Sequence, residues 1–557
     1  MGVFLYSNQT LNPENVMDVF KTRGHKNIHY HIKNNGATLI VAPKIIVKNE
    51  NYISGDELGC KEDYAVGIGT YFYKGSYGKS ALKMIYDNLN SVLASNTVYG
   101  HYAFCIHKNG ATYIFNDMSG FMRLYAYEKK GTLVISSSQT AVLSTIEKPQ
   151  IDKARLAGFV AGHYGREEGY IKGLYAIDPY KYVVIKDTEK PIWINKTVPE
   201  VRRIDNLNEA VEFVSSLFKE QMNELKSAIG DTKIYIDATG GLDSRLVASN
   251  LRTSDFNFDF INYPIYGPDA EIAKLLAKGL NKKLFVQTNK PIGADYKDHY
   301  GEFDFGNNYF RQYPNPRWIL ENDFEFSGAR GECINISDIY DDPRIFSLLP
   351  KLCHSPIINE NIQKEYSDFM VNFVSGRIGI DPTKKMTEYD QVTFIQFLNG
   401  QLGDSHYCSA AQAHCYFYSI FNEFHFNHFI SDIAFEAKTG RKLTIALIKK
   451  IDPVLGSYPF VSRRITKRNS VNEISELPLE YKSFLGVKKI LPKFIINYIY
   501  GKLGRKFNED MFNSIDIERY AGLFDVRELK AHMNLYSDIL NRLYSIDKII
   551  KHYNVLN

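Results

Sequence analysis

Short apolar runs bounded by turn residues dominate the first third of the chain. Four of these runs predict strands: residues 38–42, 102–106, 111–115 and 132–136. Asn109-Gly110 joins the middle two, and this dipeptide is typical of a two-residue hairpin. Two longer stretches predict helices, at residues 80–93 and 152–161. An α+β arrangement with stacked antiparallel sheets follows from this pattern.

Beyond residue 207 the pattern changes to strands that alternate with longer helices. Residues 210–229 carry apolar side chains at helical spacing. Strands are predicted at residues 234–236, 256–261 and 283–286, and helices after Arg245 and at 270–280. This alternation predicts an α/β half with a doubly wound parallel sheet, which binds ligands at the carboxyl ends of its strands. Further helices are predicted at residues 391–402, 409–421 and 529–553.

The change of pattern divides the chain into residues 1–195, a linker at 196–207 and residues 208–557. A length of 557 residues suits two or more domains. The net charge of +4 is too small to indicate nucleic-acid binding. None of the six cysteines forms a Cys-x-x-Cys pair, so neither a zinc site nor a disulfide framework is indicated. Neither a signal peptide nor a membrane-spanning run is recognisable, so a cytoplasmic protein without a membrane partner is expected.

The residues with the clearest chemistry follow the strand predicted at 234–236. Thr239, Gly240, Gly241, Asp243 and Ser244 connect this strand to the start of a helix. The two glycines allow a close backbone approach, and the free amides at the helix start favour a phosphate group. Asp243 would repel a bare phosphate, so a bridging Mg²⁺ is expected there. The stretch lacks the Gly-Lys-Ser/Thr of a Walker loop.

This stretch resembles the Ser-Gly-Gly-x-Asp-Ser pyrophosphate loop of the asparagine synthetase family, with Thr239 in place of the first serine. The resemblance implies that these five residues bind ATP and that Asp243 is a Mg²⁺ ligand. It also implies an ATP-pyrophosphatase type of doubly wound domain at residues 208–557, with helical extensions.

The first half resembles the glutaminase domain of the same family, which has an N-terminal-nucleophile fold. The matching segments are residues 100–104, 116–127 and 170–179. Glutaminases of this family expose a cysteine as their first residue, whose thiol attacks while the free amine acts as base. Here the second residue is Gly2 and the first cysteine is Cys60. The domain is therefore expected to be a degenerate scaffold without glutaminase activity, as in β-lactam synthetases.

A second glycine-containing stretch, at residues 327–332, resembles the family's Ser-Gly-x-Gly-x-Asp-Glu loop and is one residue shorter. By this resemblance Arg330 complements the pyrophosphate charge with its planar donor fork. Glu332 completes the Mg²⁺ coordination and contributes to catalysis. An ordinary polar turn is the alternative.

Residues 440–453 resemble the helix that carries the family's catalytic lysine. Counting back from Pro453 places Arg441 at that position, with Lys442 beside it. A cation there would stabilise the tetrahedral intermediate and the departing phosphate. The sequence does not decide between the two residues, and a solvated pair at a helix start is the alternative.

Residues 463–506 are basic, with eleven Lys and Arg against three Glu. A solvated surface explains this excess most simply, and a docking surface for an acidic peptide or carrier is the alternative.

The resemblance implies an ATP- and Mg²⁺-dependent ligase that adenylates a carboxylate, releases pyrophosphate and couples the acyl group to an amine. Three functions stay open. The first is a lasso-type peptide cyclase or similar ligase that acts on a precursor peptide. Its partner would be a protease or a leader-binding protein. Such an enzyme would belong to peptide or specialised-metabolite biosynthesis, such as that of an antibiotic. The second is a small-molecule amide synthetase that uses ammonia or a primary amine. The third is an inactive nucleotide-binding scaffold.

Overall fold

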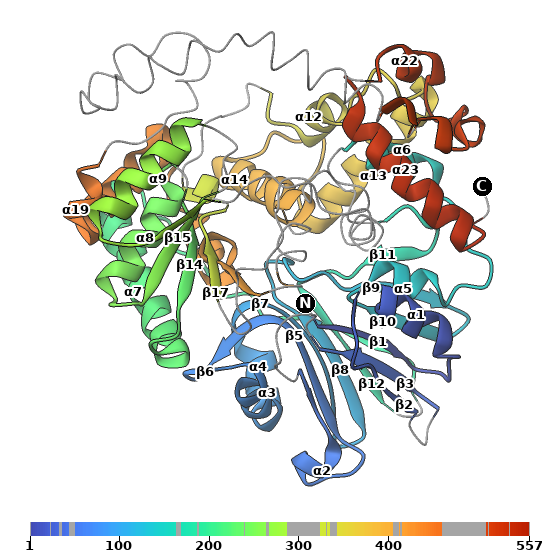
Figure 1. Ribbon diagram of the computed structural model, residues 1–557, viewed down its shortest axis with the longest axis horizontal. Coiled ribbons are helices and arrows are strands. Elements are labelled where there is room, and N and C mark those ends of the chain that lie inside the picture. The colour runs from blue at the N-terminus through green and yellow to red at the C-terminus, as the bar shows by residue number, and fades with distance from the viewer. Residues whose placement is uncertain are drawn as a thin grey trace.

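The computed structural model combines antiparallel sheets in the first half with a parallel sheet in the second (Figure 1). The structure describes these residues: 2–22, 24–32, 36–43, 51–162, 169–186, 189–238, 240–262, 267–286, 324–329, 331–334, 342–404, 412, 415–458, 508–510, 512–533 and 535–555.

Two antiparallel sheets confirm the arrangement expected for the first half. The six-stranded sheet has the order β11 (Leu174–Ala176), β9 (Tyr125–Lys129), β10 (Thr132–Ser136), β1 (Val3–Ser7), β3 (Thr38–Ala42) and β2 (His29–Ile32). The other sheet has the order β13 (Ile192–Asn195), β12 (Lys181–Lys186), β8 (Ala111–Asn116), β7 (Tyr99–Lys108), β5 (Tyr64–Tyr73) and β4 (Tyr52–Ile53), with β6 (Ser76–Tyr77) paired to β5. The predicted hairpin joins β7 and β8, with positive φ at Asn109 and Gly110.

Apolar side chains from the two sheets form a core between them, because each strand turns alternate residues inward. Helices cover the outer faces of both sheets. On one side lie α1 (Glu14–Thr22), α5 (Gln139–Leu143) and α6 (Lys153–Ala161). On the other lie α3 (Gly78–Asp87) and α4 (Leu89–Ser95), while the short α2 (Gly55–Leu58) follows β4. The predicted single helix at residues 80–93 is thus two helices, which meet at Asn88.

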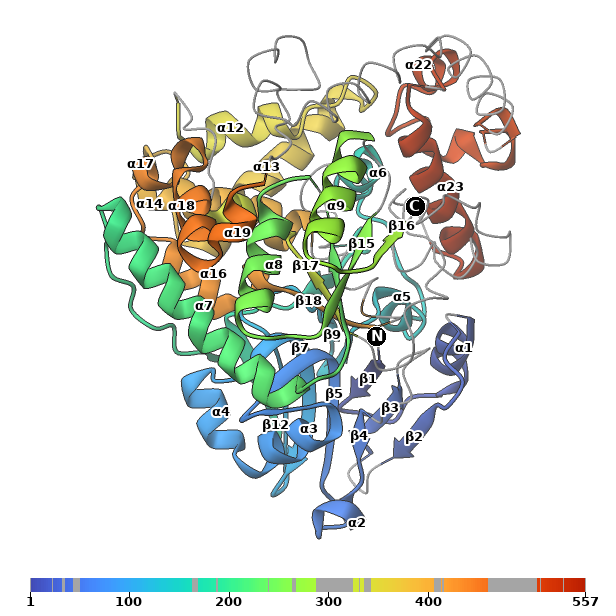
Figure 2. The same ribbon diagram turned by 60° about the vertical axis from the view of Figure 1, so that its left-hand side comes forward.

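The parallel sheet of the second half confirms the predicted alternation of strands and helices. Its order is β16 (Leu284–Val286), β15 (Phe258–Asn262), β14 (Ile234–Asp237), β17 (Phe324–Ser327) and β18 (Tyr416–Ser419). The helices packed around it include α7 (Leu207–Ile229), α8 (Asp243–Thr253), α9 (Gly267–Gly279), α16 (Phe424–Ile430), α17 (Phe435–Lys438), α18 (Lys442–Ile451) and α19 (Pro453–Gly456). Figure 2 shows α18 and α19 beside α8.

The structure corrects the helix predicted at residues 409–421. Residues 416–419 form β18, which pairs in parallel with β17 and is buried on both faces. A continuous apolar run is compatible with either a buried strand or a buried helix, so periodicity alone did not separate them. Residues 405–411 and 413–414 lie outside the described residues.

A layer of helices precedes β18 and contributes its own apolar core. It contains α12 (Ile345–Leu352), α13 (Glu360–Ile378) and α14 (Glu388–Gln396), and α14 continues as a π-helix over Phe397–Asp404.

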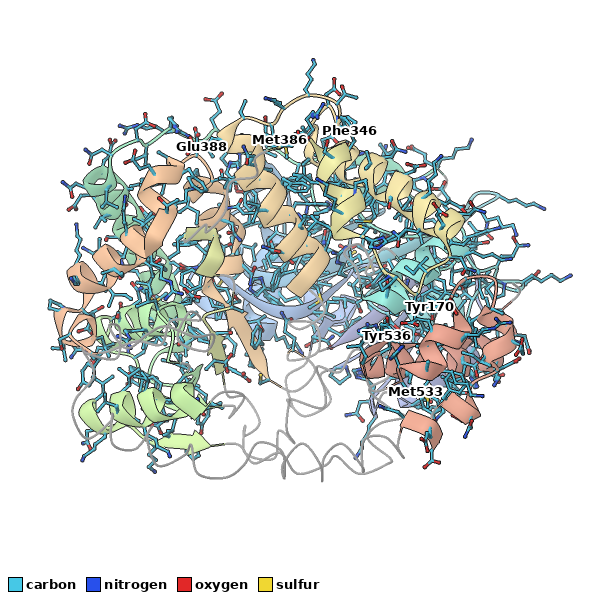
Figure 3. All side chains as sticks on the ribbon, turned by 90° about the horizontal axis from the view of Figure 1, so that it is seen from above. Tyr170, Phe346, Met386, Glu388, Met533 and Tyr536 are labelled. Atoms are coloured by element: carbon cyan, nitrogen blue, oxygen red, sulfur yellow. The ribbon has the colours of Figure 1, made fainter. Side chains whose placement is uncertain are left out.

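The last helices, α22 (Val526–Ala531) and α23 (Ser537–His552), return to the first half of the chain. Arg542 of α23 donates from Nε to the Val160 carbonyl of α6 at 2.6 Å. Leu540, Leu543 and Ile546 share an apolar core with α1, α5 and α6. In Figure 3 Tyr170, from the first half, lies close to Tyr536 and Met533. No helix in the described part of the chain is long and apolar enough to cross a bilayer.

Candidate functional site

The candidate site lies where the strand order of the parallel sheet reverses. The chain adds β15 and then β16 on one side of β14, and later adds β17 and β18 on the other side. β14 and β17 are adjacent and parallel, so the loops that follow them start at neighbouring strand ends. This topological switch point is where open parallel sheets bind their ligands.

The first glycine loop, residues 239–244, leaves the carboxyl end of β14 at this point. Gly240 and Gly241 precede α8, which begins at Asp243, while Thr239 lies outside the described residues. The amino-terminal end of α8 carries the positive end of the helix dipole, which favours an anion there. Ser244 is nearly buried and Asp243 is partly exposed. The structure thus brings Gly240, Gly241, Asp243 and Ser244 together at the switch point.

The second glycine loop, residues 327–334, leaves the neighbouring strand β17 and lies against the first. A Cβ atom added to Gly328 would stand 2.5 Å from the Ser244 amide nitrogen. One added to Gly331 would overlap the carboxyl carbon of Asp243. Only glycine permits this approach at either position. The contact joins the two loops that the sequence had linked only by resemblance.

Two residues proposed for the second loop are less fully placed. Arg330 lies outside the described residues. Glu332 lies in a short 3₁₀-helix over Gly331–Ile334, and its side chain is outside the described residues. No group of three or more His, Cys, Asp or Glu side chains in the described part of the chain could hold a metal ion. Asp243 is thus the one proposed metal ligand whose surroundings the structure describes.

Side chains at the end of β18 support the second glycine loop. Ser419 donates from Oγ to the Ala329 carbonyl at 2.9 Å, and Asn422 donates to that Oγ at 2.7 Å. The Ser419 amide donates to Nε2 of His101, on β7 of the other half, at 3.2 Å. The same Nε2 lies 3.1 Å from the Ser419 carbonyl oxygen, and burial lowers the pKa of His101. Sequence reasoning missed these residues because it treated β18 as a helix.

Arg441 and Lys442 lie at the start of α18, and Lys442 is exposed. Arg441 has a φ of +63°, in the left-handed region that costs a non-glycine residue about 1–2 kcal/mol. Gly440 shares this conformation, so two consecutive left-handed residues turn the chain from α17 into α18. Strain of this kind at a non-glycine residue is often associated with a functional position.

Packing of α18 on α8 indicates how Arg441 lies relative to the first glycine loop. The two helices are in contact. Arg252, in the last turn of α8, pairs with Asp452, which directly follows α18. The carboxyl ends of the helices therefore lie together. Both helices measure about 15 Å, so their amino-terminal ends lie on the same side.

Lys438 is a buried cation that no sequence pattern singles out. Its side chain is fully buried, and Nζ donates to the carbonyls of Ile430 and Ser431 at 2.9 and 3.1 Å. Burial lowers the pKa of Lys438 to about 8, while Cys333 of the second glycine loop acts in the opposite direction. Lys438 thus fixes the turn before Arg441 by binding the end of α16.

A second contact fixes the start of α17. The Phe435 amide donates to Glu388, whose other carboxylate oxygen pairs at 2.7 Å with Arg203, which precedes α7. Glu388 lies at the start of α14 (Figure 3). The turn that carries Arg441 is therefore attached to the helical layer, and through Glu388 to the segment that precedes α7.

The free energy of unfolding should rise with pH in the range between two pKa values of Lys438. The lower value is that of the folded protein, and the higher value is that of the unfolded chain. The unfolded side chain titrates near pH 10.4, so between pH 8 and 10.4 the unfolded state binds more protons. The gain amounts to about 3 kcal/mol across this window, and below pH 8 this residue gives no pH dependence. Urea unfolding at several pH values measures it. Lys438→Met should show a correspondingly flatter rise, and equal rises in both proteins would contradict the assignment.

Gly2 occupies the position at which the resemblance would require a nucleophile. A Cβ atom there would overlap the side-chain nitrogen Nδ2 of Asn51 and stand 3.2 Å from the Ala42 carbonyl oxygen. Asn51 is held in place by donating to that same carbonyl at 3.2 Å. The side chain of Asn51 thus fills the space into which a cysteine side chain would project.

Comparisons with known proteins give a fold likeness only. No protein-family model matches the sequence, and no curated protein matches it. Glutamine phosphoribosylpyrophosphate amidotransferase from B. subtilis, solved with ADP and GMP, is 10% identical with a TM-score of 0.23. The match covers 71% of this chain and 92% of that one. A structure described as the allosteric regulatory enzyme of purine biosynthesis is 11% identical, also at 0.23, over 71% and 91% of the two chains. Scores this low establish nothing about activity.

Proposed function

We propose that this protein is an ATP- and Mg²⁺-dependent ligase that forms amide bonds. The observation that carries the proposal is the contact between the two glycine loops at the switch point of the parallel sheet. Gly328 lies against the Ser244 backbone and Gly331 against the Asp243 side chain, so closely that a Cβ atom at either glycine would require one of these groups to move. We propose that the backbone amides at the start of α8 and the Asp243 carboxylate bind a pyrophosphate group through a bridging cation.

The proposed reaction has two steps. A substrate carboxylate oxygen attacks the α-phosphorus of ATP, so that an acyl-adenylate forms and pyrophosphate leaves. An amine then attacks the acyl carbon, loses a proton and displaces AMP. Gly240, Gly241 and Ser244 would hold the departing pyrophosphate. Thr239 and Arg330 complete this set by resemblance.

Asp243 and Glu332 would hold the Mg²⁺ ion. Because Gly331 has no side chain, the Asp243 carboxylate can lie directly against its backbone. This carboxylate lies between the two loops and offers the kind of oxygen ligand that Mg²⁺ prefers. The ion would supply charge neutralisation between this carboxylate and the phosphates. Arg441 or Lys442 would stabilise the charge that develops as the amide forms.

We propose a peptide as the substrate, with the amine on the same or a second molecule. Asn51 fills the space that a thiol at position 2 would need, so the amine does not come from glutamine by the family's route. With a peptide as the substrate, the proposed partner is a protease or a leader-binding protein. An amino acid with free ammonia is the alternative substrate set.

Product analysis tests the proposal in two arms. The purified protein is incubated with ATP and Mg²⁺, once with synthetic peptides that carry a free amine and carboxylate, and once with amino acids and ammonium chloride. AMP, pyrophosphate and an amide product in either arm are expected, and the arm that reacts identifies the substrate class. ADP and phosphate would overturn the assignment, and no reaction in either arm would favour an inactive scaffold. Glutamine alone should release no glutamate.

A further inference from the structure

An ion pair joins α8, which carries the first glycine loop, to the end of α18. Arg252 donates from Nε and one terminal nitrogen to the two carboxylate oxygens of Asp452, at 2.5 and 2.6 Å. The Asp452 side chain is fully buried, whereas that of Arg252 is about one-third exposed. Two parallel bonds of this kind restrict both distance and orientation.

Asp452 also holds the turn that follows α18. Its Oδ1 accepts from the amides of Val454 and Leu455, both at 3.1 Å, and so caps α19. The chain then returns along α8, where Arg245 donates to the Tyr458 carbonyl at 2.5 Å. Arg245 and Arg252 are seven residues apart and so lie on one side of α8. Residues 452–458 are thus attached to α8 at two points, two helical turns apart.

The remaining contacts between α8 and α18 are largely apolar. Leu443, Leu447 and Ile448 of α18 are buried in the same core as Leu246, Val247 and Leu251 of α8. Apolar packing is not directional, so it fixes the helices side by side better than it fixes their offset along the axis. A slip of one helical turn would shift the start of α18 by about 5.4 Å. The Arg252–Asp452 bonds oppose such a slip.

We infer that the Arg252–Asp452 ion pair is a positioning contact that sets the distance between the cationic start of α18 and the first glycine loop. The inference rests on the proposed function, because the distance matters only if Arg441 or Lys442 acts on a group bound in that loop. Arg252 and Asp452 lie about 15 Å from the loop at the far ends of their helices. They act through the helix offset and do not touch the reacting atoms.

The test compares Arg252→Met with a matched control. Lys233→Met removes a different ion pair, at the parallel sheet, in which Lys233 lies 2.7 Å from the nearly buried Asp259. That pair joins the start of β14 to β15 and has no part in holding α18. Both variants are assayed for binding of the non-cleavable analogue α,β-methylene-ATP with Mg²⁺ and for AMP release in the reactive substrate arm. Arg252→Met should release AMP about tenfold more slowly with unchanged analogue binding, and Lys233→Met should match wild type.

A double-mutant cycle separates positioning from a general loss of stability. In a background of Arg441→Gly with Lys442→Ala, Arg252→Met should cause no further loss of AMP release, because the groups that it positions are gone. An equal further loss in that background, or no loss in the wild-type background, would overturn the inference. Arg252→Lys keeps the charge with a single bond and should fall between wild type and Arg252→Met. It serves as the test variant if Arg252→Met does not fold. ADP in place of AMP from the wild-type protein would instead overturn the proposed function.

Discussion

Asp243→Ala should lower the release of AMP and pyrophosphate about a thousandfold or more, which corresponds to roughly 4 kcal/mol of transition-state stabilisation. Asp243 is the first residue of α8, and the backbone of Gly331 lies against its carboxyl group. Removing the carboxylate removes a ligand of the proposed Mg²⁺ ion, so the negative charges of the phosphates are no longer balanced. Rapid quench with labelled ATP measures the rate.

The size of this effect distinguishes it from a change in helix stability. An acidic residue in the first turn of a helix stabilises it by about 0.3–1 kcal/mol, far less than the expected kinetic loss. Asp255→Asn provides the control, since it removes an exposed acidic charge just beyond the other end of α8. Asparagine tolerates the positive φ of 56° at that position. Turnover by Asp243→Ala within tenfold of wild type would rule out the metal-ligand role.

Arg441→Gly should lower AMP release roughly a hundredfold or more, the scale of one lost contact to a developing oxyanion, while ATP binding stays near wild type. Glycine suits the left-handed backbone at this position, so the change relieves strain of about 1–2 kcal/mol while it deletes the guanidinium. Loss of activity in a protein at least as stable as wild type cannot be ascribed to unfolding. Single-turnover assays should still show pyrophosphate release, because the cation acts after that step.

Two comparisons decide which cation acts. Arg441→Lys should recover part of the activity, since charge survives without the planar fork. If Lys442 is the functional group, Lys442→Ala will be inactive and Arg441→Gly only weakened. Wild-type rates in both variants would show that the start of α18 is a solvated surface.

Local sequence patterns predicted much of the fold because the deciding signals were local. Alternation and the turn at Asn109-Gly110 predicted the β7–β8 hairpin, and strand–helix alternation predicted the parallel sheet. The edge strand β18 was misassigned because four consecutive buried residues, Tyr416–Ser419, carry no periodic signal. The division into residues 1–195, 196–207 and 208–557 stays a prediction.

The candidate site was predictable where it depends on glycine and missed where it depends on burial. Gly240 and Gly241, between a predicted strand and a predicted helix, identify the first loop from the sequence. Lys438 gave no signal, because a lysine is usually exposed and only the structure shows its contacts with α16. Ser419 and Asn422 became visible only once β18 was placed beside β17. The basic residues 463–506 lie outside the described residues, so their role stays a prediction.

The return of α23 to α6 affects how the chain folds during its synthesis. The apolar face that α1, α5 and α6 share with α23 is translated before α23 itself. Its partner residues, which include Leu540, Leu543 and Ile546, are translated more than 300 residues later. At 5–20 residues per second, extending the chain from residue 195 to 550 takes roughly 20–70 s. Throughout this interval the face lacks the α23 side chains that complete its core in the folded protein.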